Sequence, residues 1–157
     1  MVGVNLLMAC LLLMFTVTTA SCQVKEDKIC GNWITKEKNL VVKVFKRAGN
    51  LKAKILWFKG EGNKDMDEYK DASNPNPSLR NRKLVGLEIV EGLIYKPETE
   101  SWENGKIYDP YNGRFWDSAA YITKEGLLKV TGYWKFKWIG KTLTFDKLPD
   151  DAIVGNY

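Results

Sequence analysis

The sequence contains no histidine. Ser-His-Asp and Cys-His hydrolases and the zinc proteases with an HExxH motif all need that side chain, so these enzyme classes are excluded. Cysteine is scarce as well, because only Cys22 and Cys30 follow the apolar segment near the N-terminus. Two cysteines without histidine are a poor ligand set for zinc. We therefore expect neither a metal nor a cofactor.

The sequence also lacks an apolar run long enough to cross a bilayer, which takes roughly 20 residues. The longest run, at 6–19, ends in the small residues Ala20 and Ser21. This pattern is typical of a secretory signal peptide. We predict a signal peptide at 1–21 and a single domain at 22–157. The protein is then exported and is either periplasmic, an outer-membrane lipoprotein or secreted.

Cys22 follows three small residues, Thr19, Ala20 and Ser21. This arrangement resembles the signal of bacterial lipoproteins, in which the cysteine is acylated and associates the protein with a membrane. In the alternative interpretation, cleavage near Ala20 leaves Cys22 as a thiol. A disulfide between Cys22 and Cys30 is then possible in an oxidising compartment.

No segment has a convincing helical period, and period-2 alternation dominates instead. Leu51, Ala53, Ile55 and Trp57 alternate with Lys52, Lys54 and Leu56. The segments 128–138 and 142–145 alternate in the same way. Such patterns predict half-buried strands. Turn residues at 48–50, 104–105, 112–113 and 125–126 separate them. Short strands with frequent hairpins predict an all-β domain, an antiparallel barrel or sandwich.

A polar segment at 59–78 interrupts this pattern, and it is too long for a simple hairpin loop. Loops of this length in compact domains are usually functional or disordered.

The formal charge of +5 is compatible with anionic partners. However, lysines on the outer faces of strands also protect sheet edges from aggregation. That structural role explains much of the charge, and no nucleic-acid partner is expected. The oligomeric state does not follow from the sequence.

Three carboxylates, Asp71, Asp109 and Asp117, are candidates for an acid/base pair of the kind that hydrolyses glycosides. Turn-capping and surface carboxylates are far commoner, so an Asp-based hydrolase is the least favoured hypothesis. A calcium loop starting at Asp65 is not supported, because Lys70 stands where the EF-hand needs glycine and Asn76 where it needs glutamate.

The chain has six tryptophans, which can fill a core or line a cavity. An eight-stranded barrel is wide enough for either arrangement. Gly31-Asn32-Trp33 fits the Gly-x-Trp motif that begins the first strand of lipocalins. In that fold the tryptophan closes the base of the barrel under a basic side chain, for which Lys137 or Lys141 are the candidates.

Several further motifs occur in a fixed order along the chain. They are Gly31–Thr35, Asp71-x-x-Asn74-Pro75, Ser78-Leu79-Arg80-x-Arg82, Gly86-Leu87, Trp102-x-x-Gly105, Ile107–Pro110, Gly113, Leu128–Tyr133 and Gly140–Thr142. Together they resemble the secreted bacterial family called domain of unknown function 2147. The resemblance covers nearly the whole chain after residue 21. It implies a lipocalin-type, up-and-down antiparallel β-barrel of unknown activity.

Three positions depart from the family pattern: Thr131 and Lys141 stand where the family usually has arginine, and Trp116 stands where it usually has tyrosine. Lysine does not replace the planar fork of arginine. The resemblance therefore gives no support here for a bidentate clamp on a ligand carboxylate.

The motif residues also have a structural interpretation. Arg80 and Arg82 can pair with Asp71 or Asp109 and so tie the long loop to the barrel rim. In the functional interpretation, the same loop forms a lid over a barrel mouth.

We expect a non-enzymatic protein that binds a small apolar or amphipathic ligand inside the barrel. The alternative is an envelope interaction protein without an internal ligand. The candidate ligand-binding residues are Trp57, Arg80, Arg82, Trp102, Tyr108, Asp109, Trp116 and Tyr133.

Overall fold

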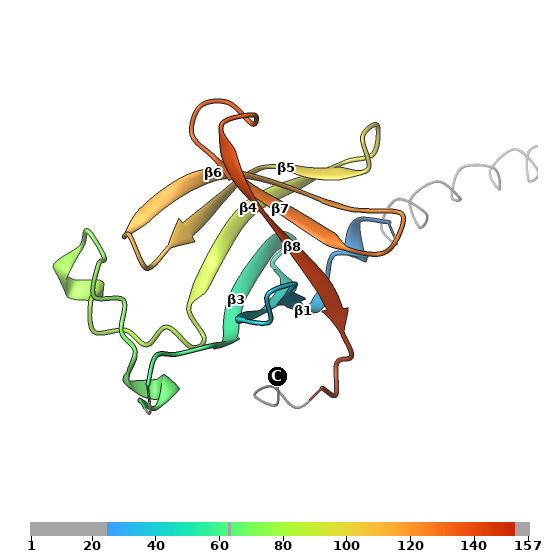
Figure 1. Cartoon of the computed structure of the whole chain (residues 1–157). Coiled ribbons are helices and arrows are strands. Elements are labelled where there is room, and N and C mark those ends of the chain that lie inside the picture. Colours follow the sequence, from blue (N-terminus) through green and yellow to red (C-terminus); the bar gives the residue numbers. More distant parts are fainter. Residues whose placement is uncertain (1–24, 63, 153–157) are drawn as a thin grey trace, which may run out of the picture.

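The computed structural model describes residues 25–62 and 64–152, and their strands form one closed antiparallel β-barrel. The strands are β1 (Gly31–Thr35), β2 (Leu40–Arg47), β3 (Asn50–Phe58), β4 (Glu88–Lys96), β5 (Ser101–Asp109), β6 (Arg114–Ile122), β7 (Leu128–Tyr133) and β8 (Gly140–Leu148). Each strand pairs with the next, and β8 returns to pair with β1. The predicted all-β, up-and-down barrel is confirmed (Figure 1).

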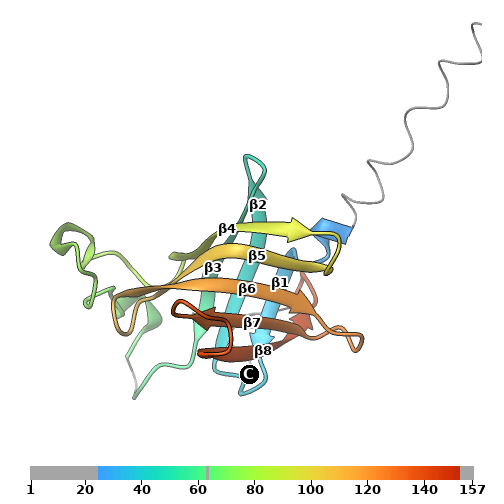
Figure 2. The same cartoon turned by 90° about the horizontal axis from the view of Figure 1, so that it is seen from above.

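The connections divide into two sets at the two ends of the barrel. The connections at 36–39, 59–87, 110–113 and 134–139 gather at one end, which we call the mouth. The turns at 48–49, 97–100 and 123–127 lie at the other end, next to the helical turn at 25–27, and we call this end the base. Figure 2 shows the long green connection at one end of the strands and the blue helical turn at the other.

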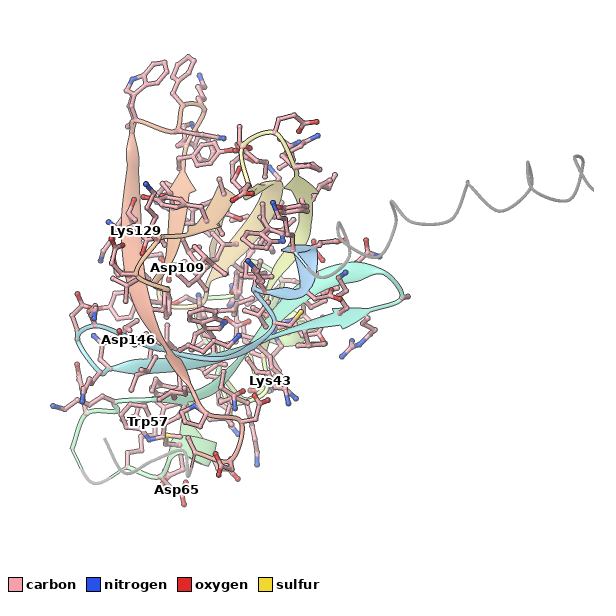
Figure 3. The ribbon with its side chains drawn as sticks, turned by 90° about the vertical axis from the view of Figure 1, so that its right-hand side faces the viewer. Lys43, Trp57, Asp65, Asp109, Lys129 and Asp146 are labelled. Atoms are coloured by element: carbon pink, nitrogen blue, oxygen red, sulfur yellow. The ribbon has the colours of Figure 1, made fainter. Side chains whose placement is uncertain are left out.

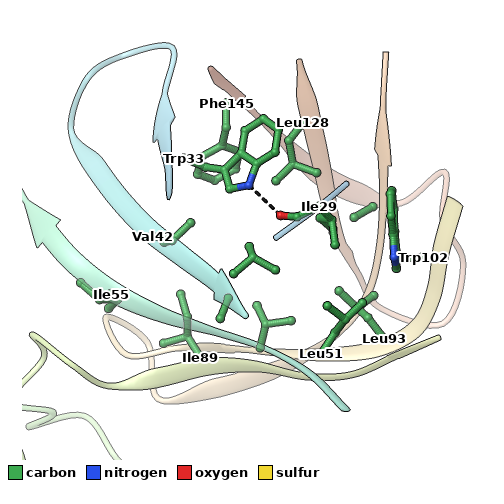
Figure 4. Packing of buried hydrophobic residues seen from close by; sticks show 14 of the residues in the cluster. Ile29, Trp33, Val42, Leu51, Ile55, Ile89, Leu93, Trp102, Leu128 and Phe145 are labelled. Atoms are coloured by element: carbon green, nitrogen blue, oxygen red, sulfur yellow. Dashed lines mark hydrogen bonds between the residues drawn. The ribbon is translucent and has the colours of Figure 1, made fainter. Parts of the chain in front are cut away.

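The interior is apolar because the side chains that alternate toward it along the strands are mainly apolar. Figure 4 shows side chains such as Val42, Ile55, Ile89 and Leu128 extending from several strands toward this space. Polar neighbours along the strands, such as Lys43, Lys54 and Lys129, alternate with them. The half-buried β-strands that period-2 alternation predicts are therefore present.

Trp33 closes the base. It is 1% exposed, and its indole N–H donates a 2.8 Å hydrogen bond to the Ile29 carbonyl (Figure 4). The Lys147 ammonium lies 5.0 Å from the centre of the Trp33 ring and donates to the Cys30 carbonyl at 2.8 Å. A Cβ on Gly31 would lie 3.1 Å from the Lys147 Cε, so glycine leaves room for this lysine. A basic residue packs on Trp33 as the lipocalin comparison implied, but the choice of Lys137 or Lys141 was wrong.

The strand that alternation predicted over 128–138 is shorter than expected, because β7 ends at Tyr133. Residues 134–139 form an exposed loop before β8. Asn104-Gly105 is not a hairpin turn either. It lies inside β5, where the pairing with β6 shifts register between Trp102 and Gly105. The predicted turns at 48–49, 112–113 and 125–126 do connect strands.

The connection between β3 and β4 is longer than the polar segment predicted at 59–78. It runs over 59–87 and contains two short 3-10 helices, η1 (Met66–Glu68) and η2 (Pro77–Leu79). Asp65 and Asn76 cap them, since each side chain accepts a hydrogen bond from a backbone N–H of its own helix.

Cys30 forms no disulfide within the part of the chain that the structure describes. Burial, followed by the nearby Asp27 carboxylate, raises the pKa of its thiol. The predicted signal peptide and Cys22, with both of its alternatives, lie outside the described residues. Within 25–62 and 64–152, no helix is long and apolar enough to cross a membrane.

Replacing Trp33 by alanine should destabilise the barrel by about 3–5 kcal/mol, because it leaves a cavity at the base. Urea unfolding followed by circular dichroism would measure this loss. Trp138→Ala is the matched control, since Trp138 is 79% exposed and should change stability little. Equal losses in the two variants would show that Trp33 does not support the base.

Candidate functional site: an apolar cavity under a polar rim

The barrel encloses a cavity of about 1470 Å³ that reaches from the core to the mouth. This is larger than the roughly 300–1,000 Å³ common for small-molecule sites. Its walls are apolar side chains from all strands except β1, among them Val44, Ala53, Val90, Ile107 and Leu143. A chain-like apolar group could therefore lie along the barrel axis.

The mouth is polar and carries lysines. Lys59 at the end of β3, Lys70 in the long loop and Lys141 at the start of β8 all line it, and all three are exposed. Lys141 shares a strand face with Leu143 and Phe145, since side chains on a strand alternate between its two faces. A positive charge thus stands directly above the apolar wall.

Acidic groups at the mouth only partly balance these lysines. Glu61 is exposed there, and Asp109 also lines the cavity. The Asp109 carboxylate, however, accepts hydrogen bonds from the backbone N–H of Tyr111 at 3.0 Å and from the Asn112 amide at 2.7 Å. Asp109 therefore shapes the 110–113 turn.

Beside the mouth, a buried carboxylate fastens the long loop to β5. Asp71 is fully buried and accepts hydrogen bonds from the Tyr108 hydroxyl at 2.6 Å, the Asn74 amide at 2.7 Å and the Arg82 Nε at 2.8 Å. We call Asp71, Asn74, Arg82 and Tyr108 the rim cluster. A buried carboxylate is stable only when it is paired and hydrogen-bonded in this way.

Further contacts tighten the rim cluster. The Asn74 amide also donates to the Tyr108 hydroxyl at 3.0 Å, and the Arg82 guanidinium lies 5.5 Å from the centre of the Tyr108 ring. Gly113 has φ of 64°, and a Cβ there would lie 1.9 Å from the Ser73 carbonyl oxygen. The 110–113 turn can approach the loop this closely only because residue 113 is glycine.

The structural interpretation of the motif residues agrees with these contacts for Arg82, which pairs with Asp71. Arg80 differs, because its Nε donates to the Asn74 carbonyl at 2.8 Å. This hydrogen bond joins two residues of the long loop and does not reach the barrel. The described contacts of Asp109 are with its own turn and include neither arginine.

Of the eight candidate ligand-binding residues, three line the cavity: Tyr108, Asp109 and Trp116. Arg80 and Arg82 do not line it, because both side chains donate hydrogen bonds to other residues of the long loop. Trp102 is 2% exposed and lies among core residues near the base, against the Tyr95 ring.

Trp57 and Tyr133 lie outside the cavity lining as well. The β2–β3 register shifts between Val41 and Val42, so Trp57 pairs with Val41 and Phe58 takes the inward position. Tyr133 follows Gly132, which lines the cavity, so alternation alone points Tyr133 to the opposite face.

The three carboxylates of the hydrolase hypothesis have separate roles in the described contacts. Asp71 belongs to the rim cluster, Asp109 caps a turn, and Asp117 pairs with Lys106 on the exposed outer face. No group of three or more acidic or cysteine side chains suited to a metal ion occurs at 25–62 and 64–152.

Sequence reasoning missed the lysines that belong to the mouth. Lys59 and Lys70 fall in or beside the polar segment, where composition gives no direction to a side chain. Lys141 was noted as a departure from the family pattern and as a candidate to cover Trp33 at the base, but not as a mouth residue. Its spacing of two and four residues from Leu143 and Phe145 is the signal that could have placed it on the inner face.

Comparison with other proteins agrees with this geometry. The barrel with one open mouth defines a lipocalin-like protein. The family model described as "Uncharacterized protein conserved in bacteria (DUF2147)" matches residues 31–147, and the chain belongs to this family. No curated protein matches the chain.

A solved structure is also similar, that of protein HP1028 from the human pathogen Helicobacter pylori, which is described as belonging to the lipocalin family. It shares 31% sequence identity with this chain at a TM-score of 0.66. The match covers 78% of this chain and 84% of HP1028.

Replacing Asp71 by asparagine should release the long loop, because it removes the charge that holds Arg82 and Tyr108. We expect a loss of about 1–3 kcal/mol in the free energy of unfolding. The loss stays below that for a fully buried ion pair, because 36% of the Arg82 side chain is exposed and its charge remains solvated.

Limited proteolysis, with mapping of the first cuts, should show faster cleavage within 59–87 in the Asp71→Asn protein. Asp67→Asn is the control, since Asp67 is exposed and pairs with Lys83 on the surface. Unchanged cleavage in the Asp71 variant would mean that the rim cluster does not hold the loop.

The rim cluster also predicts sensitivity to alkaline pH. Burial, and then the hydrogen bond to Asp71, raise the pKa of Tyr108 above its usual value of about 10. The folded state therefore holds this proton more tightly than the unfolded state. The resulting stability is fully present below the unfolded pKa and is lost as pH rises through the folded pKa.

Urea unfolding from neutral pH to above pH ~10 should show a shallower alkaline loss of stability in Tyr108→Phe than in the wild type. Tyr111→Phe, at a position 87% exposed in the wild type, should follow the wild-type curve. A Tyr108→Phe curve with the wild-type slope would contradict the assignment.

Proposed function

We propose that this protein is a non-enzymatic carrier that binds one amphipathic molecule, with an apolar chain inside the barrel and an anionic head at the mouth. The cavity of about 1470 Å³, apolar inside and bordered by Lys59, Lys70 and Lys141, carries this proposal. Fatty acids are the simplest ligands with this division of polarity.

The free-energy balance favours such a ligand. Each buried methylene contributes about 0.8 kcal/mol, so an alkyl chain lying along the cavity supplies most of the affinity. A lysine at an exposed mouth adds less, because water screens its charge. The lysines therefore select the sign and the orientation of the head group more than they add affinity.

Lysine at position 141 suits this role although the family usually has arginine there. An ammonium group acts as a point charge with rotatable donors, whereas guanidinium forms a planar fork. Thr131, the other position where the family usually has arginine, lies on the outer face, where its hydroxyl is 2.8 Å from that of Thr142. An arginine at position 131 would not line this cavity.

The alternative of a basic exterior as the main interaction surface receives less support. Lys106 on the outer face of β5, for example, pairs with Asp117 on the neighbouring strand β6. Such pairs balance part of the charge on the outer strand faces. Export, and anchoring through an acylated Cys22, belong to the proposal as the setting in which the carrier works.

The direct test is titration of the protein with palmitate while its tryptophan fluorescence is recorded. We expect saturable quenching, because Trp116 lines the cavity. Ala120→Phe adds a ring to the wall and should weaken palmitate binding by about tenfold, equivalent to one or two displaced methylenes. Binding of the shorter fatty acid decanoate should weaken less in the same variant.

Ala119→Phe is the matched control, since Ala119 is the neighbouring residue on β6 and does not line the cavity. Lys141→Gln should weaken palmitate binding more than binding of the uncharged alcohol of the same length. Lys43→Gln, on the exposed outer face of β2, should affect neither. Absence of saturable binding in a folded protein, or equal effects of the two alanine variants, would overturn the proposal.

A further inference from the structure

The connection between β7 and β8 exposes an unusual amount of aromatic surface. Trp134 is 60% exposed, Phe136 49%, Trp138 79% and Ile139 60%. The Phe136 and Trp138 rings stack with their centres 4.6 Å apart and an angle of 11° between their planes. Figure 3 shows aromatic rings standing clear of the ribbon at the end of this connection. We call residues 134–139 the aromatic loop.

Exposed apolar side chains are normal when they are scattered, but a contiguous patch of this kind usually marks an interaction site. Alternation would have buried these rings if β7 had continued. Instead the strand ends at Tyr133, and Lys135 adopts a positive φ of 65°. The Trp134 ring lies edge-on to Trp116 of β6, with the ring centres 6.2 Å apart. The stacked pair beyond it faces water.

The charge of the aromatic loop points to an anionic partner. Lysines alternate with the rings at 135 and 137, Lys141 follows at the start of β8, and residues 134–141 contain no acid. Lys137 pairs with Glu103 of β5, which fixes the loop to the barrel wall. Lys135 and Lys141 are exposed and form no described ion pair, so their charges remain available.

Aromatic rings and lysines together match a lipid surface better than a protein surface. Tryptophan is enriched at the membrane interface, where one part of the ring is apolar and another is wet. Lysine stems lie along apolar surface while their ammonium groups reach the anionic head groups. In protein–protein interfaces, by contrast, lysine is depleted.

We infer that the aromatic loop docks the barrel on the surface of an anionic lipid membrane. Phe136 and Trp138 enter the interfacial region, and Lys135 and Lys141 contact the head groups. This docking is separate from acylation of Cys22, which concerns the other end of the chain. It also stands without the proposed carrier function.

Docking in this way would bring the mouth close to the bilayer. Ile139 ends the aromatic loop and, with Gly140 and Lys141, lines the cavity. A ligand of the proposed class could then pass between bilayer and barrel over a short path through water. This consequence rests on the proposed function, whereas the docking does not.

Sedimentation with vesicles tests the docking. The purified chain carrying Cys22→Ser, which has no acylation site, is mixed with vesicles of phosphatidylcholine alone or with phosphatidylglycerol added. We expect binding that needs phosphatidylglycerol and weakens with salt. Replacing both Phe136 and Trp138 by alanine should lower the partition coefficient by about tenfold or more, because two rings no longer enter the interface.

The matched control is Tyr121→Ala, which removes a ring that is 45% exposed near the base end of β6. It should leave vesicle binding unchanged. Brominated lipids should quench the tryptophan emission of the wild type more than that of a Trp138→Phe variant, which keeps an aromatic side chain at this position.

Three results would overturn the inference. They are no binding to anionic vesicles, equal binding of the double alanine variant and the wild type, or a wild-type oligomer that the double alanine variant loses. The last result would identify a second copy of the chain as the occupant of the loop. Palmitate binding measured on the same double variant separates this test from that of the carrier function.

Discussion

Pairing of β1 with β8 closes the sheet, and the contact of Lys147 with Trp33 across this seam gives the barrel one closed end. Trp33 is on β1 and Lys147 is its pairing partner on β8, so the two ends of the strand sequence meet there. The lysine also holds the carbonyls of residues 28 and 30, which precede β1. With the base closed in this way, the cavity opens at the mouth, where the lysines and the long loop lie.

The rim cluster has a corresponding role at the other end. A charged carboxylate with no exposed surface would be costly by itself, and three donors from the loop and from β5 compensate it. The long loop thereby acquires a defined position beside the mouth. The most specific sequence motifs in the chain therefore shape the site, while the groups free to meet a ligand are the less conspicuous lysines and apolar wall residues.

The cavity and the aromatic loop carry the two proposals made above. In the first proposal an apolar chain lies inside the barrel, and in the second the rings and lysines of the loop contact a membrane. Both depend on where β7 and β8 separate, because Gly140 and Lys141 end the loop and begin the mouth wall. An ion pair between Lys137 and Glu103 links the loop to β5.

The sequence by itself determined the all-β class and the inward positions of Leu51, Ala53 and Ile55 on β3, and the likeness of Gly31-Asn32-Trp33 to the lipocalin motif pointed to closure of the base by Trp33. Period-2 alternation, tight-turn residues and a short motif are local signals, and most of them hold, although Asn104-Gly105 lies inside β5 and not in a turn. The sequence also suggested that Arg82 ties the loop to Asp71. Only the tertiary structure decided which basic residue covers Trp33, where β7 ends, and that a register shift turns Trp57 outward. These outcomes depend on strand register and on contacts between segments far apart in the chain, which no local pattern encodes.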